Sequence, residues 1–153
     1  MAGSRFVYVT YVRTTPEKLW QALIDPDFTR RYWYETRQES AWKPGAIWQL
    51  MTPDGRVADR GQILDIEPAR RLVLTWRHEL QPELHEEGHS RLTYELEKQG
   101  ESVKLTVIHE MDQPGSKLIA ALSDGWPPIL ASLKSLLETG EPLAETGRWP
   151  KGL

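Results

Sequence analysis

The hydrophobic positions of this chain follow a helical spacing near its two ends and a period of two between them. The stretch "RFVYVTYVRT" (5–14) is rich in β-branched and aromatic residues, which predicts a strand buried on both faces or nearly so. In "TTPEKLWQALID" (14–25), Thr15 as N-cap and Pro16 at the first helical position predict a helix. The stretch "DFTRRYW" (27–33) predicts a second, short helix.

Five stretches between Glu35 and Glu110 alternate in the manner of strands: 46–51, 61–67, 71–78, 90–97 and 101–110. Turn-forming residues at 53–55, 67–69 and 99–100 lie between some of them. Such short loops have no room for crossover helices, so the sheet is predicted to be antiparallel. The alternation also predicts one apolar face that needs a cover and one face in water.

The stretch "SKLIAALSDGWPPILASLKSLLETG" (116–140) carries apolar residues at helical spacing and is predicted to supply that cover. Gly140 is placed for a C-cap. Because proline removes a helical hydrogen bond, Pro127 and Pro128 predict a kink or a break at 124–128, or a new helix that begins near Gly125. The apolar space between the curved sheet and this helix is the natural place for a ligand.

Composition limits the classes of function. The length of 153 residues suits one domain, 1–153, with its core at about 5–143 and a tail at 144–153. The net charge is −3 with no basic block, so we expect no nucleic-acid partner. The absence of cysteine excludes disulfides and thiolate metal sites. There is no signal-peptide core and no run of about 18 apolar residues, so we expect no membrane contact and a cytoplasmic location.

The stretch "HEEGH" (85–89) fits H-E-x-x-H, a pattern that binds zinc when both histidines lie on one helix face. Gly88, Pro82 and the alternation that begins at Ser90 instead indicate a charged loop between two strands. We therefore expect no metal and no other cofactor. No glycine-rich nucleotide loop and no serine-nucleophile elbow is present either, so no catalytic residue is assigned.

Histidines and large aromatics on the apolar faces are the candidate ligand contacts. His109 ends the row Val103, Leu105, Val107, and His78 ends a corresponding row. Each is interpreted either as a structural histidine bonded to a neighbour or as a polar anchor or general acid–base group at the cavity. The full predicted set is Trp33, Trp48, Trp76, His78, Tyr94, His109, Trp126, Ile129, Leu130 and Leu133. Core packing is the alternative role of the tryptophans.

Several stretches resemble the bacterial Aha-type proteins, named for the activator of a heat-shock-protein ATPase, in the START-like (SRPBCC) helix-grip superfamily. They are "TTPEKLWQALIDPDFTRRYW", "G-x-I-L-D-I-E-P-x-R-R-L-V-L-T-W" (61–76), the strand that ends in His109, "GWPPILASLKSLLETG" and "LLETGEPL" (136–143). The resemblance implies an α+β helix-grip fold, β-α-α-β6-α, with a hydrophobic cavity between the sheet and the long helix. It does not imply one activity.

These observations predict a non-catalytic module that binds a small hydrophobic or aromatic molecule in the cavity. Access is expected around Gly125–Pro128 and the loop after Tyr32. One alternative is a cyclase-like or hydrolase-like enzyme that acts on an aromatic or polyketide-like substrate there. Another is a chaperone-assisting or stress-response interaction protein. The motif N-x-N-N-W of the co-chaperone's N-terminal domain is absent and the chain has no room for that domain, so direct chaperone binding is not expected; a homodimer is left open.

Overall fold

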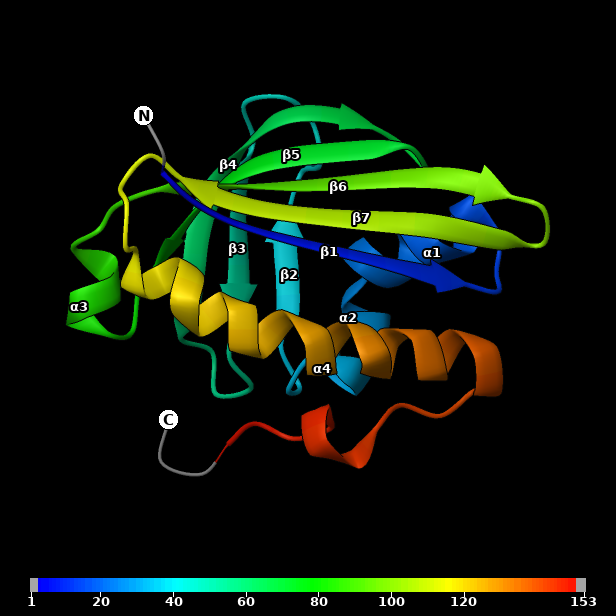
Figure 1. The fold of residues 1–153 in the computed structure, drawn as a ribbon. Helices are drawn as coiled ribbons and strands as arrows, with labels where there is room; N and C mark the ends of the chain where they lie inside the picture. Colours follow the sequence, from blue (N-terminus) through cyan, green and yellow to red (C-terminus); the bar gives the residue numbers. More distant parts are fainter. Residues whose placement is uncertain (1–2, 151–153) are drawn as a thin grey trace.

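The computed structural model describes residues 3–150, which form a seven-stranded sheet wrapped around one long helix (Figure 1). The elements in chain order are β1 (Ser4–Val12), α1 (Pro16–Ile24), α2 (Pro26–Tyr32), β2 (Arg37–Ser40), β3 (Ile47–Met51), β4 (Val57–Glu67), β5 (Arg71–His78), α3 (Pro82–His85), β6 (Ser90–Gln99), β7 (Ser102–Met111), α4 (Lys117–Thr139) and a 3-10 turn at Ala144–Thr146.

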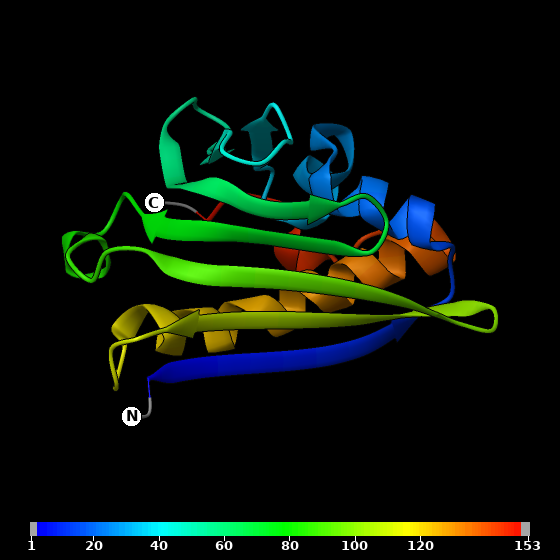
Figure 2. The ribbon, with the colours of Figure 1, turned by 90° about the horizontal axis from the view of Figure 1, so that it is seen from above.

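The strands follow the spatial order β1-β7-β6-β5-β4-β3-β2, and every neighbouring pair is antiparallel. Viewed from above, the sheet bends so that α4 lies along its concave side (Figure 2). The α+β helix-grip fold predicted as β-α-α-β6-α is therefore confirmed, with α3 as an additional single turn between β5 and β6.

Helix α1 begins where the sequence predicts, and α2 begins at Pro26, one residue before the predicted stretch 27–33. Thr15 Oγ1 accepts a hydrogen bond from the Lys18 N–H at 3.2 Å, and Asp25 Oδ1 accepts one from the Asp27 N–H at 2.8 Å. Each cap is followed by a proline, whose missing N–H would have no partner in a first turn. Asp25 thus ends α1 and starts α2, which turns the chain under the sheet.

Helix α4 continues without interruption through Pro127 and Pro128, so the predicted break at 124–128 and the alternative of a new helix near Gly125 are wrong, while the kink stays a prediction. The two prolines deprive the carbonyls of Ser123 and Asp124 of their helical donors. Ser123 is half-buried and Asp124 is exposed, so water can reach this side of the helix. Gly140 ends α4 in the left-handed conformation with φ 87°, as the sequence predicts.

The edge strand β1 differs from the prediction that both of its faces are buried. Phe6 and Tyr8 pack against the core, whereas Val7, Val9 and Tyr11 on the opposite face are each about half exposed. An edge strand of a sheet covered on one side has only one face to bury, and composition does not reveal that position. The sequence also missed β2 and placed the start of β4 too late, at residue 61 instead of Val57.

Of "HEEGH", His85 ends the single-turn helix α3, and residues 86–89 form the predicted loop that leads into β6. The most connected side chain of this loop is Glu87, which caps the N-terminus of α4. The Glu87 carboxylate accepts hydrogen bonds from Ser116 Oγ at 2.6 Å and from the N–H groups of Lys117 and Leu118 at 2.8 and 3.2 Å. These are N–H groups that a helix leaves without internal partners, so the segment anchors the long helix.

The described part of the C-terminal tail packs on the domain. The Thr146 carbonyl accepts a hydrogen bond from the Tyr34 N–H at 2.7 Å, and Ser132 Oγ accepts one from the Leu143 N–H at 2.9 Å. The predicted domain 1–153 and its tail extend over residues 1–2 and 151–153, which lie outside the described residues. Within residues 3–150, no helix has the length and hydropathy needed to cross a bilayer.

Candidate functional site

The concave face of the sheet and α4 enclose a cluster of aromatic side chains. Trp76 of β5 lies 4.7 Å from Trp48 of β3 and 6.0 Å from Trp33 after α2, measured between ring centroids. Trp126 of α4 lies 5.3 Å from Trp33 and 6.1 Å from Tyr94 of β6. Residues far apart in the sequence thus place their rings against one another, Trp33 and Trp76 stacked and the other pairs tilted or edge-on.

The predicted ligand contacts are brought together in this interior, where they pack closely against each other. Apart from the two histidines, all of them belong to one buried core cluster; they are Trp33, Trp48, Trp76, Tyr94, Trp126, Ile129, Leu130 and Leu133. None of five surface pockets of about 310 to 810 Å³ is lined by any predicted contact. Their role in binding stays a prediction, and a ligand would have to displace packed side chains.

His109 is fully buried and both of its ring nitrogens have partners. Trp126 Nε1 donates a hydrogen bond to His109 Nδ1 at 3.2 Å. Nδ1 is therefore the acceptor, so Nε2 carries the proton and donates to Ser90 Oγ at 2.7 Å. Ser90 in turn donates to the Trp76 carbonyl at 2.8 Å. Burial lowers the pKa of His109 to about 3, so the ring is neutral at physiological pH.

The indole N–H groups explain why polar residues occur in this core. Trp48 Nε1 donates to Gln38 Oε1 at 2.9 Å, and Trp76 Nε1 donates to Asp59 Oδ1 at 2.8 Å. Gln38 and Asp59 are buried, and sequence reasoning missed both because it did not recognise β2 or the first residues of β4. No local sequence signal marks Asp59, because its place directly opposite His78 comes from the β4–β5 register.

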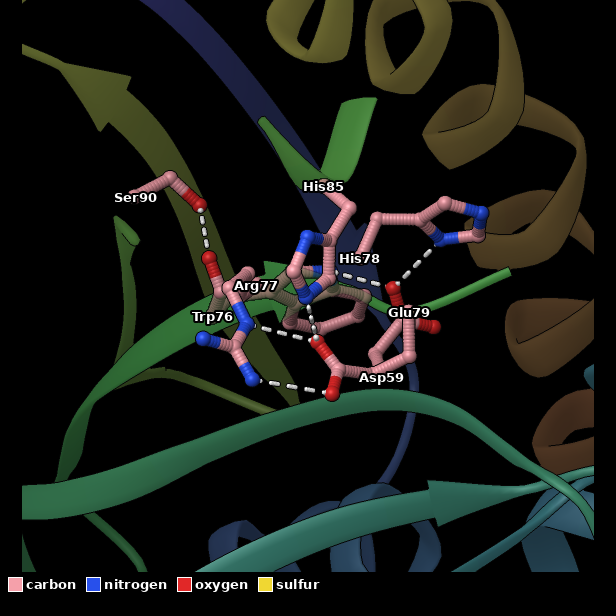
Figure 3. Close-up of polar contacts among 7 residues, drawn as sticks. All are labelled: Asp59, Trp76, Arg77, His78, Glu79, His85 and Ser90. Atoms are coloured by element: carbon pink, nitrogen blue, oxygen red, sulfur yellow. Dashed lines mark hydrogen bonds and ion pairs between the residues drawn. The ribbon is translucent and has the colours of Figure 1, made fainter. Parts of the chain in front are cut away.

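At one end of β5, the buried Asp59 pairs with His78, which is partly buried (Figure 3). His78 Nδ1 lies 2.9 Å from Asp59 Oδ1, the oxygen that also accepts from Trp76. Burial raises the pKa of Asp59, and the hydrogen bond from His78 opposes this effect. The other ring nitrogen, His78 Nε2, is buried and has no hydrogen-bond partner within residues 3–150.

Beside this pair, Arg77, Glu79 and His85 form a more exposed group (Figure 3). Arg77 donates to Glu79 from Nε and from a terminal nitrogen at 2.6 and 3.0 Å, and these hydrogen bonds lower the pKa of Glu79. His85 Nε2 lies 3.6 Å from the same carboxylate, while His89 is exposed. No group of three or more metal-ligating side chains among residues 3–150 is arranged to hold a metal ion.

The arrangement of secondary structure and its core agree with one protein family. The profile of the family described as "Activator of Hsp90 ATPase homolog 1-like protein" matches residues 13–138. The chain belongs to this family. The match begins after β1 and ends near the end of α4, so it includes every predicted ligand contact. No curated protein matches the chain.

Solved structures share the fold of this family member at low sequence identity. CalU16 from Micromonospora echinospora is 21% identical, with a TM-score of 0.72 over 93% of this chain and 78% of that one. The Aha1 dimer from Colwellia psychrerythraea is 19% identical, with a TM-score of 0.70 over 90% and 98% of the two chains. DynU16, from the dynemicin biosynthetic locus, is 23% identical with a TM-score of 0.73, and the match covers 92% of this chain but 49% of DynU16.

Proposed function

We propose that this family member binds a small hydrophobic or aromatic molecule between the sheet and α4 without converting it. The observation that carries the proposal is the set of indole rings, Trp33, Trp48, Trp76 and Trp126, that converge from separate elements on one interior. Such rings offer large apolar faces to an aromatic guest. The biosynthetic locus of the structural neighbour DynU16 supports a role that involves small molecules.

The state of His109 supports binding over acid–base catalysis at that residue. A general base must offer a lone pair to the proton that it removes. His109 Nδ1 already accepts from Trp126, and Nε2 already donates to Ser90. Use of either nitrogen for catalysis would break a buried hydrogen bond, so His109 is better suited to holding Trp126 in place.

The packed interior predicts how binding would be detected. Because the predicted contacts are buried against each other, a guest must move at least one ring of the cluster, which includes Trp126 from the covering helix. A change in tryptophan fluorescence should therefore accompany binding. Removal of the Trp126 ring should alter the affinity of the protein for its ligand at least tenfold. The reason is that full burial of a large apolar side chain is worth about 1.5–3 kcal/mol of free energy.

The test is native mass spectrometry of the full chain purified from its own host, followed by chemical identification of any bound compound. The recovered compound is then titrated into the wild type, Trp126→Ala and the matched control Tyr11→Ala, whose ring is exposed on the other face of the sheet. The proposal expects the compound to be recovered unchanged and only Trp126→Ala to alter its affinity. A compound that is converted during incubation, or equal affinities in both variants, would contradict it.

We also propose that this chain forms a homodimer. The structural neighbour from Colwellia psychrerythraea was solved as a dimer, which supports a second copy as partner. The edge strand β1 exposes Val7, Val9 and Tyr11 side by side on one face, where an isologous contact could bury them. Light scattering should give twice the chain mass for the wild type and a smaller mass for Val9→Lys. A monomeric wild type at 100 μM would refute the proposal.

A further inference from the structure

The Asp59–His78 pair fixes which ring nitrogen of His78 carries a proton. An indole N–H can only donate, so the bond from Trp76 Nε1 at 2.8 Å makes Asp59 Oδ1 an acceptor. The oxygens of an ionised carboxyl can only accept, so with Asp59 as the carboxylate His78 Nδ1, 2.9 Å from the same oxygen, is a second donor to it. In the neutral ring this leaves the lone pair on Nε2, because the proton resides on Nδ1.

That lone pair has no donor inside the protein. Among the buried side-chain nitrogen and oxygen atoms of residues 3–150, only His78 Nε2 and Thr146 Oγ1 have no hydrogen-bond partner. Buried polar groups generally have a hydrogen-bond partner, so a buried polar atom without one in a native structure needs an explanation. His109 provides the contrast within the same sheet, because both of its nitrogens are bonded.

We infer that His78 Nε2 is the polar anchor of the interior binding site, and that the ligand is a phenol or alcohol whose hydroxyl donates a hydrogen bond to it. This inference rests on the proposed binding function and adds the class of ligand. A ligand with a carboxylate is disfavoured, because its oxygens have only lone pairs to present to the lone pair of His78 Nε2. It would also bury a second charge in a region that already buries the carboxyl of Asp59. An ether or a hydrocarbon has no proton to donate.

The surroundings of His78 suit the apolar part of such a ligand. Trp76, which shares Asp59 Oδ1 with His78, packs against Trp33, Trp48 and Trp126. The carboxylate that orients His78 is therefore bonded to a ring of the aromatic cluster as well. The side chain of His78 is 16% exposed, and the single turn α3 contacts β5, the strand that His78 ends. Leu84 is the buried residue of α3 and belongs to a core cluster with Met111, Leu118 and Ile119.

The experiment compares three probes of similar shape: 4-ethylphenol, 4-ethylanisole and 4-ethylbenzoate. Calorimetric titration of the full wild-type chain should give about tenfold tighter binding of 4-ethylphenol than of 4-ethylanisole, and no binding of 4-ethylbenzoate, because a buried acceptor gains its missing donor only from the phenol. In His78→Phe the ratio for the first two probes should fall to about one. The matched control His85→Phe, on the exposed end of α3, should keep the tenfold ratio.

A second measurement on the wild type does not depend on the folding of a variant. In ¹⁵N spectra of the imidazoles, the unprotonated Nε2 of His78 should shift when 4-ethylphenol is added and stay unchanged with 4-ethylanisole. Equal affinity for the two probes, or a preference that survives in His78→Phe, would overturn the inference and leave the proposed function intact. If neither probe binds the wild type, both the inference and binding of small aromatic molecules are refuted.

Discussion

The burial of His109 should make the stability of this protein fall between pH 7 and pH 5, and His109→Gln should remove that contribution. Burial lowers the pKa of His109 to about 3 in the folded chain, against roughly 6.5 in an unfolded chain. Between these values the unfolded state binds a proton that the folded state does not. The free energy of unfolding therefore decreases as the pH falls.

The magnitude follows from the two pKa values. The slope approaches about 1.36 kcal/mol per pH unit once the pH is well below 6.5. Integrated from pH 7 to pH 5, the contribution of His109 is a loss of about 2 kcal/mol. Glutamine at position 109 retains an oxygen that can accept from Trp126 and an N–H that can donate to Ser90, but it does not titrate.

Urea unfolding followed by tryptophan fluorescence at pH 7 and pH 5 measures this difference. The loss on acidification should be about 2 kcal/mol larger in the wild type than in His109→Gln. The control His85→Gln removes an exposed histidine and should retain the wild-type loss, because His109 is still present. If wild type and His109→Gln lose equal stability, His109 takes up a proton in the folded state and the buried hydrogen-bond chain described above is wrong.

Three further substitutions test the contacts that hold the site, each by urea unfolding at pH 7. Ser90→Ala leaves the Nε2–H of His109 buried without an acceptor and should lower the free energy of unfolding by about 2 kcal/mol. The control Ser102→Ala should change it by less than about 0.5 kcal/mol. Equal effects of the two substitutions would contradict the hydrogen bond between His109 and Ser90. Glu87→Ala removes the cap of α4 and should lower the free energy of unfolding by about 1–2 kcal/mol. Glu86 is exposed, so the control Glu86→Ala should have little effect. An unchanged stability in Glu87→Ala would refute the capping role. Gly61→Ala places a Cβ 1.6 Å from the Thr75 carbonyl oxygen and should lower the free energy of unfolding by at least about 2 kcal/mol. The control Gly125→Ala in α4, where nothing lies within 4 Å of the added Cβ, should be neutral or stabilising. A tolerated Gly61→Ala would show that β4 and β5 do not approach this closely.

Capping by Glu87 also predicts acid sensitivity at the start of α4. Burial by itself would raise the pKa of Glu87, but hydrogen bonds from Ser116, Lys117 and Leu118 lower it overall. A carboxyl with a lowered folded pKa stabilises the protein above the unfolded value of about 4.3 and loses that contribution as the pH falls. The protection factor of the Ile119 amide should therefore fall on acidification more in the wild type than in Glu87→Gln.

Local sequence was sufficient to predict the elements whose signals are local. Thr15 and Asp25 cap their helices with their own side chains, and Gly140 supplies the left-handed residue that ends α4. The period of two likewise identified the apolar faces of β5, β6 and β7, because alternation along a strand fixes the side of the sheet on which a side chain lies. Pro127 and Pro128 suggested a break that does not occur, because the proline rule does not state whether water can satisfy the released carbonyls.

Contacts between distant segments were decided only by the tertiary structure. The sequence placed His78 and His109 on apolar faces and left their roles open. Strand register then set Asp59 opposite His78, and Ser90 and Trp126 came to lie within hydrogen-bond distance of His109. The tertiary structure also places Glu87 of "HEEGH" where its carboxylate caps α4, the helix that begins at Lys117. A hydrogen bond depends on the distance and direction between two atoms. A sequence pattern specifies the face on which a side chain lies, but not which residue of another segment lies opposite that side chain.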